Sequence, residues 1–196
     1  YGDANTCKDL PQMIEYVHEE CRKNKVWAKR IIVDTNGSNR TPEWWAKLGE
    51  INKKSLEYSG KPGLELVFAI DGITQSMHSK YRRGTNLDKI LKNIKAYVDA
   101  GGFALTNTIV FKHNQDYLKD IMNMTKDHGV SFHIFHESDR VEMFDENGVY
   151  TFYDEENNKQ TLEMCDSDIV LKQLEDEIER VKIVAPNRVV YYSANG

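Results

Sequence analysis

Short apolar runs and helical apolar repeats alternate along the first two thirds of this chain. The runs, at residues 30–34, 64–70, 104–111 and 130–135, predict strands, and the nearly unbroken run at 64–70 is typical of a strand that is buried on both faces. Before and between them, apolar residues recur every three or four positions, which predicts four amphipathic helices. A regular strand–helix alternation favours a parallel sheet with right-handed crossovers. We therefore expect these four strands to be adjacent and parallel in one α/β sheet.

Local signals predict where the helices begin and end. Asp9 is positioned to cap the first helix, which continues to about Asn24, and Thr41 with Pro42 is a strong start for the second. Gly101 follows the third helix as a left-handed stop. The repeat predicts these buried positions: Met13, Ile14, Val17 and Cys21; Trp45, Leu48, Ile51 and Leu56; Leu87, Ile90, Leu91, Ile94 and Val98; Tyr117, Leu118, Ile121 and Met122.

The pattern changes after about residue 140. Residues 141–144 and 149–153 flank an Asn147-Gly148 pair, which predicts an antiparallel hairpin. We expect a charged loop at 155–160, an acidic helix over 167–184 and a final strand at 188–192. The predicted organisation is a partial (β/α) barrel at 1–140 and an α+β extension at 141–196.

Composition and charge narrow the class of protein. The 196 residues are 40% apolar and include three tryptophans, which suffices for one sizeable core. The net charge of −5 argues against a general attraction to nucleic acid or to an anionic membrane. The sequence contains no apolar run of the ~20 residues that a membrane helix needs and no signal-peptide pattern, so we expect a soluble, cytoplasmic protein.

The three cysteines, Cys7, Cys21 and Cys165, are far apart and show no CxxC spacing. This spacing argues against a disulfide framework and against a zinc site. We predict reduced thiols and no metal ligands.

Polar residues follow the predicted strands, where parallel α/β folds bind ligands. Thr35-Asn36-Gly37 follows the first strand, and Asn-Gly there is equally compatible with a simple turn. Asp71 is suited either to a ribose hydroxyl or to capping its own loop. Arg82 and Arg83 are suited either to a ligand contact or to a solvent-exposed segment that leads into the next helix.

His113, His133 and His136 lie near predicted strand ends and raise a metal or acid–base hypothesis. Strand alternation places His133 and His136 on opposite faces, however, which favours cleft or packing roles over a shared metal.

Several of these segments together resemble the core of radical S-adenosylmethionine (radical SAM) enzymes, in unbroken order over residues 1–140. The matching segments are Tyr1-Gly2-Asp3, Thr35-Asn36-Gly37-Ser38, Ala69-Ile70-Asp71-Gly72, Tyr81-Arg82-Arg83-Gly84 and Asp99-Ala100-Gly101-Gly102. The resemblance is strongest to peptide- and protein-modifying members that carry a C-terminal iron–sulfur (SPASM-type) extension. It implies a partial (β/α) barrel of parallel strands, and both ends of the chain look truncated by comparison.

The resemblance also implies cofactor contacts. Gly2 and Asp3 match the segment that receives the methionine amino group of S-adenosylmethionine, with Asp in place of the family's Glu. Thr35 and Asn36 match a loop that lines the cofactor cleft.

Further along the chain, Asp71 lies in a segment similar to the family's Ser-Ile-Asp-Gly, where Ala69 replaces the contacting serine. Arg82 corresponds to the arginine that pairs with the cofactor carboxylate, and Arg83 is the competing assignment. His136 is placed near the adenine together with Phe135.

The family's CxxxCxxC loop, which holds a [4Fe-4S] cluster, has no counterpart in this chain. In family order it would precede Tyr1. A site-differentiated cluster needs closely spaced thiolates, so we expect residues 1–196 to bind no cluster by themselves.

The implied function is reductive cleavage of S-adenosylmethionine at a [4Fe-4S] cluster, followed by hydrogen abstraction from a peptide or protein substrate, with an electron donor as second partner. One alternative is a barrel-derived structural or interaction protein that has lost the cluster, for which Asp3 and Ala69 argue. A hydrolase or aldolase-like barrel is disfavoured, because the sequence shows no nucleophile elbow, catalytic lysine context or phosphate loop.

Overall fold

The computed structural model describes residues 3–26, 30–174, 181–185 and 188–190. The α-helices are α1 (Leu10–Lys23), α2 (Pro42–Ser59), α3 (Gln75–Ser79), α4 (Leu87–Asp99), α5 (Leu118–Lys126) and α6 (Ser167–Leu174). The strands are β1 (Ile31–Thr35), β2 (Leu64–Ala69), β3 (Phe103–Val110), β4 (Phe132–Glu137), β5 (Val149–Tyr153), β6 (Lys159–Glu163), β7 (Val181–Ala185) and β8 (Arg188–Val190). Short 3₁₀ helices cover Ala4–Thr6 (η1), Gln115–Tyr117 (η2) and Val141–Met143 (η3).

One sheet contains six strands in the order β1-β2-β3-β4-β7-β8. The first four strands are parallel, and in the β1–β2 pair Val33 lies opposite Leu66. Strand β7 runs parallel to β4, and β8 runs antiparallel to β7. The prediction that the first four strands are adjacent and parallel is confirmed.

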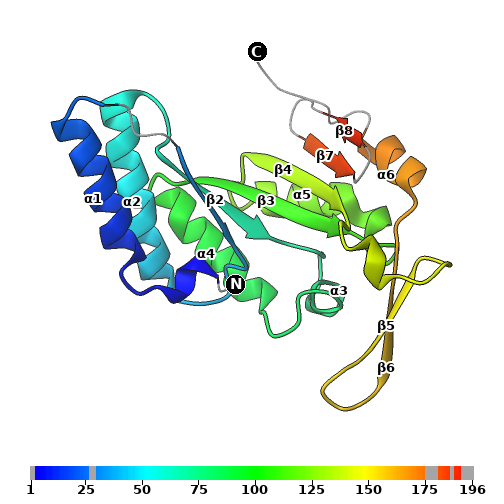
Figure 1. Cartoon of the computed structure of the whole chain (residues 1–196). Helices are drawn as coiled ribbons and strands as arrows, with labels where there is room; N and C mark the ends of the chain where they lie inside the picture. The colour runs from blue at the N-terminus through cyan, green and yellow to red at the C-terminus, as the bar shows by residue number, and fades with distance from the viewer. Residues whose placement is uncertain (1–2, 27–29, 175–180, 186–187, 191–196) are drawn as a thin grey trace. The chain divides into compact units, whose positions relative to one another are not determined.

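The chain divides into two compact units, whose helices and strands are labelled in Figure 1. The first comprises residues 1–70, 85–106 and 125–132, and the second comprises 71–84, 107–124 and 133–196. Strand β3 contributes its first half to one unit and its second half to the other. The predicted boundary at residue 140 stays a prediction. None of the helices in the described residues has the length and apolarity that a bilayer crossing requires.

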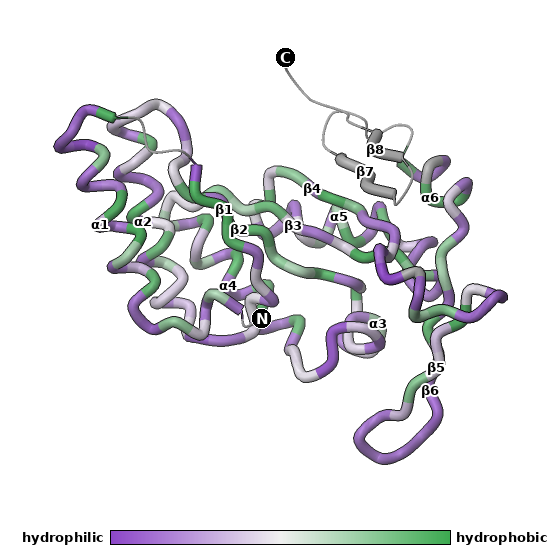
Figure 2. The backbone as a smooth tube through the Cα atoms, in the orientation of Figure 1, coloured by the Kyte–Doolittle hydropathy of each residue, from purple (hydrophilic) through white to green (hydrophobic). Residues whose placement is uncertain are grey.

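The core of the first unit forms where α2, α4 and β2 meet. All six residues of β2 are buried, and the strand appears largely green in the hydropathy view (Figure 2). Gly49 permits a close approach of α2 to α4, because a Cβ there would lie 2.3 Å from the Tyr97 carbonyl oxygen. The Tyr97 hydroxyl in turn donates to the Leu64 carbonyl oxygen at 3.1 Å. Both helices are thereby held on the sheet.

Four apolar side chains that the helical repeat places inside are exposed. Met13 and Val17 of α1 are 57% and 42% exposed, Leu56 is 43% exposed and Tyr117 is 40% exposed. In α1 the buried residues are Pro11 and Ile14, because this helix packs mainly on its neighbour α2. Periodicity shows which positions share a helix face, but it does not show how much of that face a neighbour covers.

The helices begin where expected, but two of the predicted caps are wrong in detail. Asp9 and Thr41 precede α1 and α2, yet neither side chain makes a capping hydrogen bond. The Thr41 hydroxyl bonds the Glu43 carboxylate instead, which lowers the pKa of Glu43. Pro42 correctly predicted the start of α2. It lies in the first turn, where the backbone N–H that proline lacks would have no partner within the helix.

The hairpin of the second unit differs from its prediction. Residues Val141–Met143 form η3, not a strand, and β5 pairs antiparallel with β6, which was expected to be partly loop. The side chain of Asp145 accepts the amides of Asn147 and Val149, so the Asn-Gly turn closes locally without a preceding strand. The hairpin turn is made at Asp154, whose carboxylate accepts the amides of Glu156 and Asn158. Its tip is purple in Figure 2.

The predicted acidic helix over 167–184 is wrong in its length. Helix α6 covers Ser167–Leu174, and Val181–Ala185 form β7. The predicted last strand is present as Arg188–Val190, and its remaining residues lie outside the described part of the chain. Helix α6 is attached through Gln115, whose side chain accepts the Asp166 amide at 2.8 Å and whose carbonyl oxygen accepts the Gln173 side chain at 2.7 Å.

Candidate functional site

Two polar clusters occupy the strand ends to which the sequence analysis pointed. The Asp3 cluster (Asp3, Asn5, Thr35 and Asn36) belongs to the first unit. The Asp71 cluster (Asp71, His78, Arg82, Ile109 and Asn114) belongs to the second. Gly2, the remaining predicted contact at the N-terminus, lies outside the described residues.

Asp3 is the acceptor at the centre of the first cluster. Its carboxylate accepts the Asn5 amide at 3.0 Å, the Thr35 hydroxyl at 2.9 Å and the Asn36 amide at 2.6 Å. These three donors pin the end of β1 to η1. A carboxylate offers about four lone-pair positions, so Asp3 retains one for a further donor.

The Thr35 hydroxyl has no capacity left. It donates to Asp3 and accepts both the Asn5 side-chain amide at 2.9 Å and the Gly37 amide at 3.0 Å. Since a hydroxyl has one proton and two lone pairs, Thr35 is a positioning residue in this arrangement. Asn36 differs, because its Oδ1 accepts the Ser38 amide while its side-chain NH₂ has no partner among the described residues.

Gly37 completes the turn after β1. Its φ is 68°, and a Cβ would lie 2.7 Å from the Phe68 ring and 3.1 Å from Ile90. Only glycine satisfies both the positive φ and the close approach. The Asn-Gly pair therefore makes the turn out of the strand, and the assignment of this loop to a cofactor stays a prediction.

The Asp71 carboxylate is fully buried and holds Arg82. Arg82 Nε donates to Asp71 Oδ2 at 2.5 Å, and the Ile109 amide donates to Oδ1 at 2.7 Å. The backbone of Asp71 is held as well, because its amide donates to His78 Nδ1 and its carbonyl oxygen accepts the Asn114 side chain at 3.1 Å. With no exposed surface, this carboxylate acts by orienting Arg82.

Burial sets the electrostatics of this cluster. Burial raises the pKa of Asp71, and the positive charge of Arg82 and the Ile109 amide act against it. Burial also lowers the pKa of His78 to about 4, with Arg82 adding to the effect. His78 is therefore neutral near pH 7, and its Nδ1 lone pair is available to the Asp71 amide.

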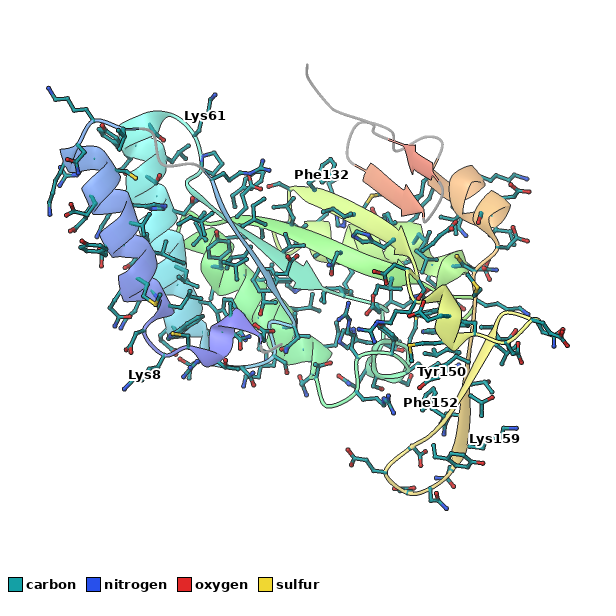
Figure 3. All side chains as sticks on the ribbon, viewed as in Figure 1. Lys8, Lys61, Phe132, Tyr150, Phe152 and Lys159 are labelled. Atoms are coloured by element: carbon teal, nitrogen blue, oxygen red, sulfur yellow. The ribbon has the colours of Figure 1, made fainter. Side chains whose placement is uncertain are left out.

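The two competing arginines have different surroundings. The Arg82 side chain is 25% exposed, and its guanidinium carbon lies 5.1 Å from the centre of the Tyr81 ring. The guanidinium of Arg83 lies 4.4 Å from the ring centre of Phe152 on the hairpin. Phe152 stacks on Tyr150 at 5.7 Å, and Figure 3 labels both rings on β5.

The histidines occupy separate positions. His133 is buried and stacks with Phe135, whereas His136 is half-buried on the other face of β4. His113 is half-buried and stacks on Phe111 at 5.9 Å. Within the described ranges, no three His, Cys, Asp or Glu side chains are grouped so that they could hold a metal ion.

Sequence reasoning missed four residues of these clusters and one nearby. Asn5, His78, Asn114 and Ile109 shape the two networks, and only the neighbouring side chains reveal this. Asn107 of β3 has a buried side-chain oxygen with no hydrogen-bond partner among the described residues. Asn107 lies on the half-buried face of β3, where the other residues, Phe103, Leu105 and Ile109, are apolar. A polar amide on this otherwise apolar face was the sequence signal that could have identified it.

We expect the free energy of unfolding to fall as the pH drops from about 6.5 toward 4. Burial lowers the pKa of His78 and of His113 to about 4, while the unfolded chain titrates near 6.5. The unfolded state then binds more protons in this interval, so acid destabilises the folded state by roughly 3 kcal/mol for fully buried His78 and by less for half-buried His113. The raised pKa of Asp71 contributes with the opposite sign.

Urea unfolding at several pH values measures this dependence. His78→Asn keeps a side-chain acceptor but cannot titrate, and its stability should vary less between pH 6.5 and 4 than that of the wild type. An equally steep dependence in this variant would contradict the assignment to His78.

Comparisons with known proteins identify the fold. No protein-family model and no curated relative matches the chain. Two solved structures of the radical S-adenosylmethionine methyltransferase TsrM from Kitasatospora setae are similar to it, each at 10% sequence identity. The structure with cobalamin and a [4Fe-4S] cluster gives a TM-score of 0.54 over 90% of this chain and 43% of the other. The structure with tryptophan substrate and the analogue aza-SAM gives 0.55 over 97% and 46%.

The similarity extends over nearly the whole of this chain but less than half of its neighbours. The chain thus has a radical SAM-like α/β fold with a parallel sheet, as the sequence predicted. The assignments of Gly2, Asp3, Thr35, Asn36, Asp71, Arg82 and His136 to a cofactor, and their convergence on one cleft, stay predictions.

Proposed function

We propose that this chain is the S-adenosylmethionine-binding part of a radical SAM enzyme. The observation that carries the proposal is the orientation of Arg82 by a fully buried Asp71, within a fold similar to radical SAM enzymes. A buried ion pair costs desolvation energy unless its hydrogen bonds are satisfied. Here the Asp71 carboxylate accepts the Ile109 amide as well as Arg82 Nε, and the Asn114 side chain holds the Asp71 backbone carbonyl oxygen. A function for Arg82 in holding a ligand would explain why the protein keeps an ion pair that costs desolvation energy.

Each of the two clusters, taken by itself, has groups that fit a part of S-adenosylmethionine. The remaining lone pair of Asp3 is an acceptor for the methionine ammonium group, and the side-chain NH₂ of Asn36 is a donor. Arg82 is suited to the methionine carboxylate, because guanidinium and carboxylate form strong charge-assisted hydrogen bonds. His136 would lie near the adenine. When bound at a reducing cluster, S-adenosylmethionine supplies the capacity to abstract hydrogen from a substrate.

The cysteines present do not fit a [4Fe-4S] cluster. Cys7 is exposed and lies just after η1, Cys21 lies in α1, and Cys165 lies between β6 and α6. Burial raises the pKa of Cys165 to about 12, so this thiol is a poor ligand near neutral pH. We propose that the cluster ligands lie outside residues 1–196.

The remaining assignments extend the same proposal. A peptide or protein is the proposed substrate, an electron donor is the second partner, and the cytoplasm is the compartment. The hairpin carries Tyr150 and Phe152 on one strand and is a candidate contact for such a peptide.

Binding of S-adenosylmethionine to residues 1–196 tests the proposal. Isothermal titration calorimetry should detect binding, and Arg82→Gln should weaken it about 10- to 100-fold, as expected for the loss of a charged hydrogen bond worth about 1.5–3 kcal/mol. Arg82→Lys, which keeps a positive charge beside Asp71, should weaken it less.

Arg83→Gln is the matched control, because it removes the same charge one residue away and should leave the affinity within about twofold. Equal losses in the Arg82 and Arg83 variants would indicate a general charge effect. Failure of the wild-type chain to bind would contradict the proposal.

A second candidate function is a structural or interaction protein that retains the fold. Ala69 lacks the hydroxyl of the family's serine, and the Thr35 hydroxyl is fully used within the protein. This alternative predicts no binding of S-adenosylmethionine in the same experiment.

A further inference from the structure

A cavity of about 390 Å³ lies between the C-terminal halves of α1 and α2 in the first unit. Its wall is completed by Pro62 and Gly63, which lead into β2. The two helices run side by side and end at the same end of this unit (Figure 1). The cavity contains no residue of the Asp3 or Asp71 cluster, so the proposed S-adenosylmethionine contacts do not account for it.

The wall of the cavity carries an excess of negative charge. Glu15, Glu19 and Glu57 line it together with the cations Arg22 and Lys54. Lys54 is already paired with Glu15 at 2.8 Å. In the last turn of α1 the carbonyl oxygens of Glu20, Cys21 and Arg22 already accept backbone amides, so the excess comes from the carboxylates of the wall that are unpaired among the described residues. A cation in the cavity would offset this excess.

The cavity also has an apolar part, and His18 forms part of its wall. The Gly63 carbonyl oxygen lies 3.3 Å from His18 Nε2 and can only accept, so this nitrogen carries the proton. His18 Nδ1 is then an acceptor, and it is buried without a partner among the described residues. Burial lowers the pKa of His18, so the ring stays neutral near pH 7. Ile51, Pro62 and the ring of Tyr58 provide the apolar part of the wall.

We propose that the cavity between α1 and α2 binds a small organic amine, with its ammonium group at the carboxylates and its carbon chain against the apolar wall. The carboxylates of Glu19 and Glu57 match N–H donors. A bare metal ion is disfavoured, because no described group of three His, Cys, Asp or Glu side chains could hold one.

Titration of residues 1–196 with putrescine, followed by the amide NMR signals of α1 and α2, tests the proposal. 1,4-Butanediol is the matched neutral probe, since hydroxyl groups replace the two ammonium groups on the same carbon chain. We expect putrescine to bind at least tenfold more tightly than butanediol, with weaker binding at high salt. Equal affinities, or binding of inorganic phosphate in place of putrescine, would overturn the proposal.

Three variants localise the binding. Glu19→Gln and Glu57→Gln, at exposed positions of the wall, should each weaken putrescine about threefold, as is usual for one partly exposed charge pair. Asp88→Asn removes the same charge from α4, which does not line the cavity, and should leave the affinity unchanged. Equal weakening by all three variants would show that putrescine responds only to net charge. The outcome is separate from S-adenosylmethionine binding, which the Arg82 variants report.

Discussion

Replacing Asp71 with alanine is expected to lower the free energy of unfolding by about 3–5 kcal/mol, the usual cost of removing one partner of a buried ion pair. The Asp71 side chain is 0% exposed, and its loss leaves the Arg82 guanidinium and the Ile109 amide without their acceptor. Urea unfolding followed by far-UV circular dichroism measures the change.

A double-mutant cycle separates the pair from its surroundings. Arg82→Met should also be strongly destabilising, because it leaves the Asp71 carboxylate buried without its cation. The double variant Asp71→Ala/Arg82→Met should lose less than the sum of the two single changes. Asp99→Ala breaks the exposed Lys95–Asp99 pair and should cost no more than about 0.5 kcal/mol. Additive losses within the cycle would contradict a direct Asp71–Arg82 interaction.

Replacing Trp45 with alanine should destabilise the first unit by about 3–5 kcal/mol, as large-to-small changes in cores do. Trp45 is 1% exposed, its ring centre lies 5.3 Å from that of Phe68, and its Nε1 donates to the Asn39 carbonyl oxygen at 3.0 Å. The change therefore creates a cavity and leaves the Asn39 carbonyl oxygen with only the Asn93 side chain as a donor, at 3.3 Å.

The neighbouring tryptophan provides the control. Trp44 is half-buried, lies edge-on to Trp45 and is covered by Arg40, whose guanidinium carbon is 5.6 Å from its ring. The Trp44 Nε1 is buried without a partner among the described residues. Trp44→Phe removes this orphan donor and should change the stability by less than about 1 kcal/mol. A larger loss at Trp44 than at Trp45 would reverse the assignment of the core ring.

Local signals predicted the elements of the first unit but not their contacts. Pro42 and the apolar repeat identified α2, and the unbroken run at 64–70 identified β2. For β5 the predicted partner strand, residues 141–144, was wrong. The Asn147-Gly148 signal is a genuine turn, but the strand that pairs with β5 begins at Lys159, where the sequence looks like charged loop. An exposed strand needs few apolar residues, so its composition is a weak guide.

The candidate site shows a similar division. Asp3, Thr35, Asn36, Asp71 and Arg82 were selected because each follows a predicted strand or matches a family segment. The sequence did not indicate that Asp71 and Arg82 form a pair, nor that the Thr35 hydroxyl is fully used by Asp3, Asn5 and Gly37. Each of these facts depends on which other groups lie within hydrogen-bonding distance.

The sequence by itself determined the alternation of α1, α2, α4 and α5 with the first four strands, and the parallel arrangement of those strands, because both follow from short-range periodicity and from crossover lengths. Only the tertiary structure decided the role of Asp71. Its carboxylate accepts the amide of Ile109, 38 residues away, and its carbonyl oxygen accepts the side chain of Asn114, 43 residues away. Burial and hydrogen bonding at one position are set by segments distant in sequence, and no local pattern encodes which segments will meet.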